Sequence, residues 1–185
     1  MPELACTPGQ TVGPFFHCAL AHPGDNQLVG DAQAGAIRLH GTVYDGAGDA
    51  VPDALVELWQ TGPDGNIAQH AGSLRRDGKT FTGWGRCATD AAGRYSFSTL
   101  TPGAPAAGRA AFFAMVVFAR GLLNRVFTRA YLPDSDLAAD RLLSALDAAR
   151  RRTLICDAEK GGYRFDIHLQ GANETVFLAY RGDPE

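Results

Sequence analysis

The sequence contains no long apolar segment and no excess of positive charge. Its longest apolar run falls well short of the roughly 20 residues that a membrane-spanning helix needs, and its first four residues lack the basic start of a secretory signal. With 17 Lys and Arg against 20 Asp and Glu, the net charge is −3, which gives no basic face for a nucleic acid. We therefore expect a cytoplasmic protein with no membrane or nucleic-acid partner.

Local motifs for metal, cofactor or nucleophile chemistry are also missing. The four cysteines form no C-x-x-C pair, so we expect free thiols with structural roles. No two of the five histidines are one, three or four residues apart, which removes the usual local pair of metal ligands. The G-x-S-x-G, P-loop and H-E-x-x-H motifs are absent as well. A metal site gathered from distant strands stays open on these residues alone.

The sequence does contain a series of short strand patterns separated by turns. Residues 37–44 alternate between apolar and polar side chains, and so do residues 163–169. Strands are predicted over residues 37–44, 54–60, 86–89, 94–100, 110–121, 124–132 and 163–169, with residues 174–180 closing the chain. The 22 glycines and 10 prolines suit the many tight turns that such a chain needs. The fold class predicted is all-β, an antiparallel β-sandwich.

The most continuously apolar stretch runs from Ala110 to Gly121. Its length and its β-branched and aromatic content suit a strand buried on both faces. It ends on Arg120, and a cation at the end of an apolar strand has to be paired or exposed. One interpretation is a structural salt bridge with an acidic residue. The other is recognition of a carboxylate, which the guanidinium fork suits.

One helix is predicted near residues 135–149. Residues 133–136 carry a helix-start signal, the apolar residues that follow have helical spacing, and the three arginines at 150–152 stand at or just past the end. Residues 1–36 show no sustained period and are interpreted as an extended N-terminal arm and loop that packs on a partner chain. Residues 37–185 would form the β-sandwich, in a single domain overall.

Several segments, read together, resemble the intradiol ring-cleaving dioxygenases. The resemblance covers nearly the whole chain, from about Thr7 to about Tyr180, in the order of the family. The segments are Thr7-Pro8-Gly9-Gln10-Thr11-Val12-Gly13-Pro14-Phe15, Gly41-Thr42-Val43-Tyr44-Asp45-Gly46, Leu55-Val56-Glu57-Leu58-Trp59-Gln60, Gly85-Arg86-Cys87-Ala88-Thr89-Asp90, Phe118-Ala119-Arg120-Gly121, Thr128-Arg129-Ala130-Tyr131 and Tyr163-Arg164-Phe165-Asp166-Ile167-His168-Leu169-Gln170-Gly171.

The resemblance implies an intradiol β-sandwich and an enzyme built from two homologous chains. In such members the beta subunit holds a non-haem Fe(III) with two tyrosines and two histidines. The substrates implied are protocatechuate and O2, and the product is 3-carboxy-cis,cis-muconate. This chain is similar to the alpha-type partner, so we expect it to pair with a beta subunit and to join a higher alpha–beta oligomer.

By the same resemblance, the places of the four iron ligands fall at Ile67, Ala104, Phe112 and Ala114. Hydrocarbon side chains cannot bind a hard ferric ion, which prefers oxygen and imidazole donors. We therefore expect the iron to be held by the partner chain, with no metal ligand and no catalytic residue in this one. This copy of the site is expected to be filled with hydrophobic packing.

The resemblance also assigns a role to the N-terminal arm. Thr11, Gly13, Pro14 and Arg120 are predicted to line the substrate pocket of the partner chain, where Gly13 lets the backbone approach the ring closely. The carboxylate of protocatechuate would be the partner of Arg120, directly or through the arm. Packing between the two chains is the alternative role of these residues. Arg129 is a weaker candidate and is expected to be structural.

A second function stays open at this point. The alternative is a transthyretin-like β-sandwich, a binding or scaffold module with no enzymatic partner. A self-sufficient dioxygenase with unusual ligands is disfavoured, because all four ligand places are lost together.

Overall fold

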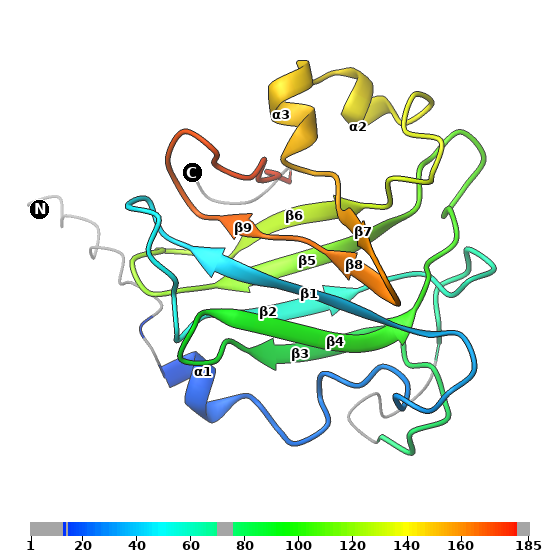
Figure 1. Cartoon of the computed structure of the whole chain (residues 1–185), viewed down its shortest axis with the longest axis horizontal. Coiled ribbons are helices and arrows are strands. Elements are labelled where there is room, and N and C mark those ends of the chain that lie inside the picture. Colours follow the sequence, from blue (N-terminus) through cyan, green and yellow to red (C-terminus); the bar gives the residue numbers. More distant parts are fainter. Residues whose placement is uncertain (1–12, 14, 70–75, 181–185) are drawn as a thin grey trace, which may run out of the picture.

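The computed structural model describes residues 13, 15–69 and 76–180 and consists of two β-sheets packed face to face (Figure 1). The first sheet has the order β4 (Arg94–Leu100), β1 (Ala36–Tyr44), β8 (Gly162–Arg164) and β7 (Asp157–Glu159), with β9 (Ile167–His168) also paired to β1. The second has the order β3 (Trp84–Ala88), β2 (Leu55–Trp59), β5 (Phe112–Phe118) and β6 (Val126–Tyr131). Neighbouring strands are antiparallel, except that β8 and β9 run parallel to β1. The predicted antiparallel β-sandwich is confirmed.

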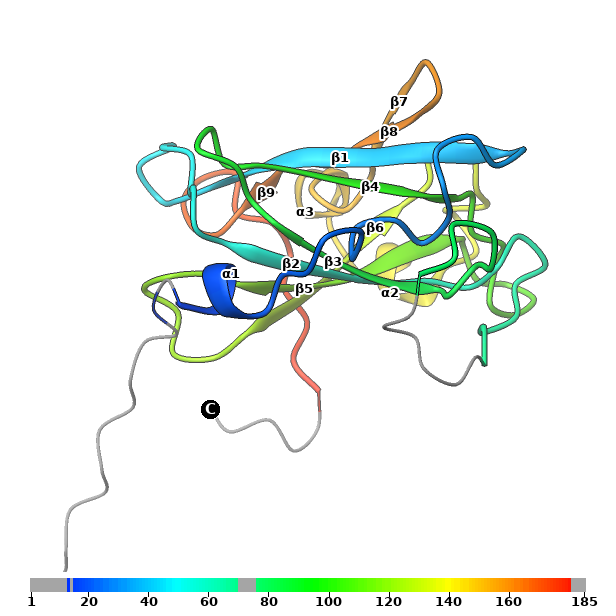
Figure 2. The same cartoon turned by 90° about the horizontal axis from the view of Figure 1, so that it is seen from below.

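The core lies between the two sheets, which Figure 2 shows edge-on as two layers. Alternate side chains of each strand enter it, because successive residues of a strand point to opposite faces. Strand β5 contributes Phe113, Met115 and Val117, all buried. They meet side chains such as Leu39 of β1 and Phe97 of β4.

The expectation that β5 is buried on both faces is wrong for much of its outer face. There only Val116 is buried, whereas Phe112, Ala114 and Phe118 are half-buried. The opposite sheet covers the inner face of β5 alone, so the outer face depends on short local elements for cover. This outer face carries the candidate site.

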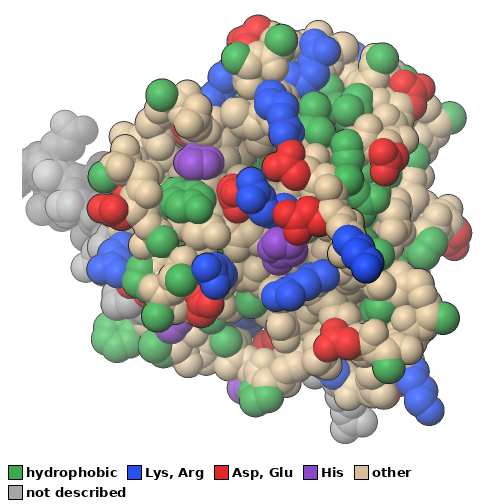
Figure 3. Space-filling view, viewed as in Figure 1, with side chains coloured by type: hydrophobic (Ala, Val, Ile, Leu, Met, Phe, Trp, Pro, Cys, Tyr) green, Lys and Arg blue, Asp and Glu red, His purple; other side chains and the backbone are tan. Residues whose placement is uncertain are grey.

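The outer face of the first sheet has a different character. Figure 3 shows charged side chains gathered over β1, β7 and β8. His40 is hydrogen-bonded to Glu159 across 2.9 Å, and the Arg164 guanidinium lies 3.6 Å from Asp157 and 3.4 Å from Asp166. This face is solvated and paired within itself, whereas the outer face of the second sheet is largely apolar.

The six strands expected between residues 37 and 132 are confirmed as β1 to β6, with ends that differ by up to a few residues. The later region was predicted less well. Strand β7 was not expected, the pattern over 163–169 splits into β8 and β9, and residues 174–180 form an isolated bridge between Leu178 and Phe127 in place of a strand.

The prediction of a single helix near residues 135–149 is wrong. The structure has two short helices, α2 (Arg141–Ser144) and α3 (Ala148–Arg152), at the edge of the sandwich next to β6 (Figure 1). Each begins at its own cap, because the Asp140 carboxylate accepts from the N–H groups of Leu142 and Leu143, and that of Asp147 accepts from Arg150. The three arginines therefore lie inside α3.

The N-terminal segment contains a helix that was not predicted, α1 (Phe15–Ala19). Further along, Leu28 and Val29 are buried, the Leu28 N–H donates to Ser98, and the Leu20 carbonyl accepts from Arg86. The described part of residues 1–36 is thus packed on the sandwich of its own chain. Packing of the rest on a partner chain stays a prediction.

Candidate functional site

Three of the four places predicted for iron ligands come together in the structure. Ile67, Phe112 and Ala114 line one hollow of about 200 Å³ on the outer face of the second sheet. Pro105 also lines it and directly follows Ala104, the fourth place. The hollow is defined here by these residues together with Trp59, and its walls are almost entirely apolar.

Two turns bring these residues together from distant parts of the sequence. Ile67 is held by a bridge to Thr61, just after β2, and the 103–105 turn packs against this loop through a hydrogen bond from Gly103 to Gly62. Gly65 makes the contact possible, since a Cβ atom there would lie 2.3 Å from the carbonyl oxygen of Ala104, and its φ of +81° favours glycine.

The donor set of the hollow does not fit a ferric ion. Ile67, Ala104, Phe112 and Ala114 offer no oxygen, nitrogen or sulfur from their side chains, and Fe(III) needs oxygen or imidazole donors. In residues 13, 15–69 and 76–180 there is no group of three or more His, Cys, Asp or Glu side chains that would hold a metal ion. No chemical step through iron is assigned to this chain.

The prediction that hydrophobic packing fills this place is wrong. Ile67 is 72% exposed and Trp59 is 51% exposed, so both stand at the rim of an open hollow. The physical reason is the size of Ala114. This residue pairs with Trp59 of β2 on one side and with Arg129 of β6 on the other, and its single methyl group cannot fill the space between them.

Arg129, the weaker candidate of the sequence, is not a lining residue of the hollow but stands next to it, because it pairs with Ala114 and stacks on Phe112. Its guanidinium carbon lies 4.3 Å from the centroid of the Phe112 ring, a cation–π contact. The same guanidinium donates to the hydroxyl of Tyr131 across 3.2 Å. Burial raises the pKa of Tyr131, so this hydroxyl keeps its proton near neutral pH.

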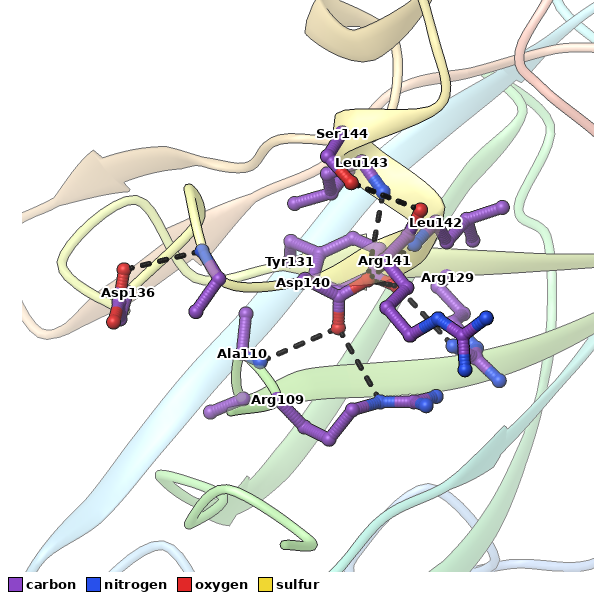
Figure 4. Close-up of polar contacts among 12 residues, drawn as sticks. Arg109, Ala110, Arg129, Tyr131, Asp136, Asp140, Arg141, Leu142, Leu143 and Ser144 are labelled. Carbon is purple, nitrogen blue, oxygen red and sulfur yellow. Dashed lines mark hydrogen bonds and ion pairs between the residues drawn. The ribbon is translucent and has the colours of Figure 1, made fainter. Parts of the chain in front are cut away.

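The Tyr131 hydroxyl also contacts a buried carboxylate, that of Asp140 (Figure 4). Its Oδ2 accepts from the backbone N–H of Ala110 and lies 3.6 Å from Nε of Arg109, while Oδ1 accepts from Leu142 and from the Tyr131 hydroxyl at 3.3 Å. Asp140 and Arg109 were not among the site residues predicted from the sequence. An aspartate two residues before Leu142 is a recognisable cap signal, whereas nothing local marks Arg109.

Arg120 lies at the opposite end of β5 from the hollow. Its Nε donates to Oδ1 of Asp53 across 3.0 Å, and its side chain remains 59% exposed. Arg120 therefore forms a salt bridge with an acidic residue of its own chain, as the first interpretation expected. The carboxylate-binding interpretation is compatible with that exposure and stays a prediction.

The N-terminal arm approaches the same end of β5. Thr11 and Pro14, two of the predicted pocket residues, lie outside the described residues. Gly13 is described and has a φ of +50°, with no atom within 4 Å of the position that a Cβ would take. Phe16 of α1 stacks on Phe118 of β5 with ring centroids 5.4 Å apart. Among the described residues, Arg120 thus lies at one end of β5, and the hollow with Ile67, Phe112 and Ala114 lies at the other.

Comparisons with known proteins agree with this arrangement. A family profile described as "Dioxygenase" matches residues 12–171. The alpha chain of protocatechuate 3,4-dioxygenase from Burkholderia cepacia is 36% identical to this chain, over 96% of this chain and 99% of that protein. The chain belongs to the intradiol ring-cleaving dioxygenase family. The resemblance read from the sequence is confirmed.

Further relatives extend the match to both chain types. The alpha chain of protocatechuate 3,4-dioxygenase from Pseudomonas putida is 36% identical, over 97% of this chain and 98% of that protein. The beta chain from Burkholderia cepacia is 34% identical, over 90% of this chain and 76% of that protein. Intradiol dioxygenases, as a family, are oxidoreductases that open aromatic rings, and this chain is a member.

Solved structures show the same fold. An intradiol ring-cleavage dioxygenase from Tetranychus urticae superimposes with a TM-score of 0.61 at 14% identity, covering 93% of this chain and 98% of that one. The dioxygenase domain of a carbohydrate-binding fusion from Streptomyces sp. SirexAA-E gives 0.60 at 24% identity, covering 90% and 99%. None of the helices in the described part of the chain is long and apolar enough to cross a membrane.

Proposed function

We propose that this chain is the alpha subunit of a protocatechuate 3,4-dioxygenase, in which a homologous beta subunit holds the non-haem Fe(III). The observation that carries the proposal is the hollow at Ile67, Phe112 and Ala114. A chain that is 36% identical to alpha chains along nearly their whole length carries hydrocarbon side chains at the places where the resemblance puts iron ligands.

The proposed reaction is O2-dependent intradiol cleavage of protocatechuate to 3-carboxy-cis,cis-muconate. The bound ferric ion would supply the binding of the catechol oxygens and the activation of the ring. Similarity to both an alpha and a beta chain supports a pair of related sandwiches that face one another. We expect this chain to be inactive without its partner.

The part of this chain proposed to reach the partner's pocket is the Arg120 end of β5, together with Thr11, Gly13 and Pro14. The absence of a Cβ atom at Gly13 allows the backbone to lie against an aromatic ring. The exposed guanidinium of Arg120 is suited to the substrate carboxylate, because its fork of N–H groups matches two carboxylate oxygens. The hydrogen bond to Asp53 would keep the Arg120 guanidinium in this position before substrate or the arm binds.

The test is to produce the chain alone and together with a beta chain that carries the two tyrosines and two histidines. Iron content and oxygen uptake with protocatechuate are measured for both preparations. We expect iron and activity only in the paired preparation. Stoichiometric ferric iron in the lone chain, with the visible absorption of a tyrosinate–iron bond, would overturn the proposal. Failure of the two chains to associate would favour the binding-module interpretation instead.

A further inference from the structure

The hollow above Ala114 results from the register of the four strands in the second sheet. Four side chains form one row across the outer face, because β3, β2, β5 and β6 pair Trp84 with Trp59, Trp59 with Ala114, and Ala114 with Arg129. Directly opposed side chains on one face lie about 4.5–5.5 Å apart at Cβ. A methyl group between an indole and a guanidinium therefore forms the floor of a depression.

The size and lining of the hollow suit one six-membered ring. Trp59, Ile67, Pro105 and Phe112 surround Ala114 with hydrocarbon and aromatic surface, and the volume is about 200 Å³. An apolar protein cavity of roughly 150 Å³ holds benzene. Trp59 stands opposite Ala114 on β2, and Phe112 stands two residues before Ala114 on β5. A ring placed over Ala114 would therefore contact aromatic surface both across the sheet and along the strand.

The positive charge next to the hollow belongs to Arg129. Within the described ranges, no carboxylate oxygen lies within 4 Å of a nitrogen of Arg129. The buried Asp140 accepts from backbone N–H groups and lies beside Arg109, and the Tyr131 hydroxyl stands between it and Arg129. A half-buried guanidinium on an aromatic face, next to apolar walls, favours a ligand with a negative head and an apolar ring.

We propose that this hollow binds a monocyclic aromatic carboxylate without any metal. The ring lies over Ala114 against Trp59 and Phe112, and its carboxylate points toward β6, where it receives hydrogen bonds from the Arg129 guanidinium. This inference does not depend on the function proposed above, because it uses only side chains of this chain and is measured by binding.

The first experiment titrates benzoate into the full chain and follows heat and tryptophan fluorescence. Trp59 is the exposed one of the two tryptophans and reports on the hollow directly. Arg129→Gln is compared with Arg125→Gln, whose guanidinium also stacks on an aromatic ring, that of Phe127 at 5.0 Å, but does not border the hollow. We expect saturable binding of one benzoate that weakens about tenfold or more in R129Q and stays within about twofold in R125Q.

Three further experiments separate the contribution of the ring from that of the charge. Benzyl alcohol, a neutral ring of similar size, should bind more weakly than benzoate and with equal affinity to the wild type and R129Q. Ala114→Leu places a larger side chain on the floor, and it should abolish binding of both compounds while the melting temperature shows that the chain is folded. Arg129→Lys keeps the charge and should retain part of the benzoate affinity.

Three results would overturn the proposal. These are the lack of saturable benzoate binding, equal effects of R129Q and R125Q, and unchanged binding in A114L. The titration is repeated after adding the iron-bearing beta chain. Because the proposed function gives the beta chain an aromatic-carboxylate pocket of its own, wild type and R129Q are compared in this mixture. Benzoate binding that R129Q still weakens supports the small-molecule site, whereas loss of that R129Q-sensitive binding would assign the hollow to a segment of the partner polypeptide. Ring-cleavage activity does not enter any of these readouts.

Discussion

Phe16 stacks on Phe118 with ring centroids 5.4 Å apart and ring planes 13° from parallel. This contact joins α1 to the end of β5, two residues before Arg120. A helix of five residues is too short to be stable by itself, so α1 depends on the stack for its place. The position of α1 beside the Arg120 end of β5 therefore depends partly on the stacking of Phe16 on Phe118.

The first prediction follows from this contact. Phe16→Ala should release α1 and lower the free energy of unfolding by about 1–2 kcal/mol, because a stacked aromatic pair and its buried area are lost. Limited proteolysis should cut the segment around α1 faster than in the wild type. Phe15→Ala is the matched control, since Phe15 is in the same helix and is 79% exposed. Equal cleavage rates in the two variants would contradict a specific role for the stack.

The second prediction concerns Arg120 in the assembled enzyme and rests on the proposed function. Arg120→Ala should raise KM for protocatechuate roughly ten- to one-hundred-fold, the loss expected for a charge-assisted contact of about 1.5–3 kcal/mol. KM for catechol, which has no carboxylate, should change little. Steady-state kinetics with both substrates make the comparison. The same increase for both would show that Arg120 only supports the fold through Asp53.

Asp53→Asn provides the complementary variant. It removes the negative charge that holds Arg120 in this chain but leaves the guanidinium in place. If Asp53 positions Arg120, KM for protocatechuate should rise in this variant too, by less than in R120A. A KM equal to that of the wild type would show that the pair is incidental.

The strands were predictable because their pattern is local. Residues 36–44 alternate between the core and the outer face, and the burial of Leu39 and Val43 follows that period of two. The division of the region near residues 135–149 into α2 and α3 was not predictable in the same way. Leu142, Leu143 and Leu146 have helical spacing, but Asp140 is captured by the Ala110 backbone, a contact 30 residues away that no local pattern encodes.

In the candidate site, too, some features were predictable from the sequence, whereas others depend on contacts between distant residues. The resemblance located Ile67, Phe112 and Ala114 from sequence order alone, and the structure brings them together. Its expectation of a filled core failed, because exposure depends on which side chains stand opposite Ala114. Trp59 and Arg129 became its neighbours only through the register of β2, β5 and β6, and that register is set by the whole sheet.

The third prediction tests the buried carboxylate of Asp140. Asp140→Ala should cost about 2–3 kcal/mol, because the helix cap is lost and the Ala110 N–H and Tyr131 hydroxyl lose a buried acceptor. Asp147→Ala removes an exposed cap of the same residue type and should cost about 1 kcal/mol. Urea unfolding of both variants provides the measurement. Equal losses would mean that Asp140 acts as a helix cap and nothing more.

The fourth prediction concerns the response of stability to high pH. Burial raises the pKa of the Cys156 thiol to about 12, whereas a thiol in an unfolded chain ionises near about 8.5. Between these two values the unfolded chain gives up a proton that the folded protein keeps. The unfolded state then binds fewer protons, so the free energy of unfolding falls as pH rises from about 8.5 toward 12.

Urea unfolding at pH values from about 7 to 10, with a reductant present, measures this slope. Wild-type protein should lose about 1–2 kcal/mol over that range from Cys156 alone. Cys156→Ala should lose correspondingly less with pH, although its stability at neutral pH is lower because a buried side chain is truncated. Cys18→Ala, which removes an exposed thiol, should keep the wild-type slope. Because Tyr95 is also buried with a raised pKa, some slope should persist in every variant near pH 10. Identical slopes in wild type and C156A would show that the thiol ionises in the folded protein, which requires water to reach the space between the sheets.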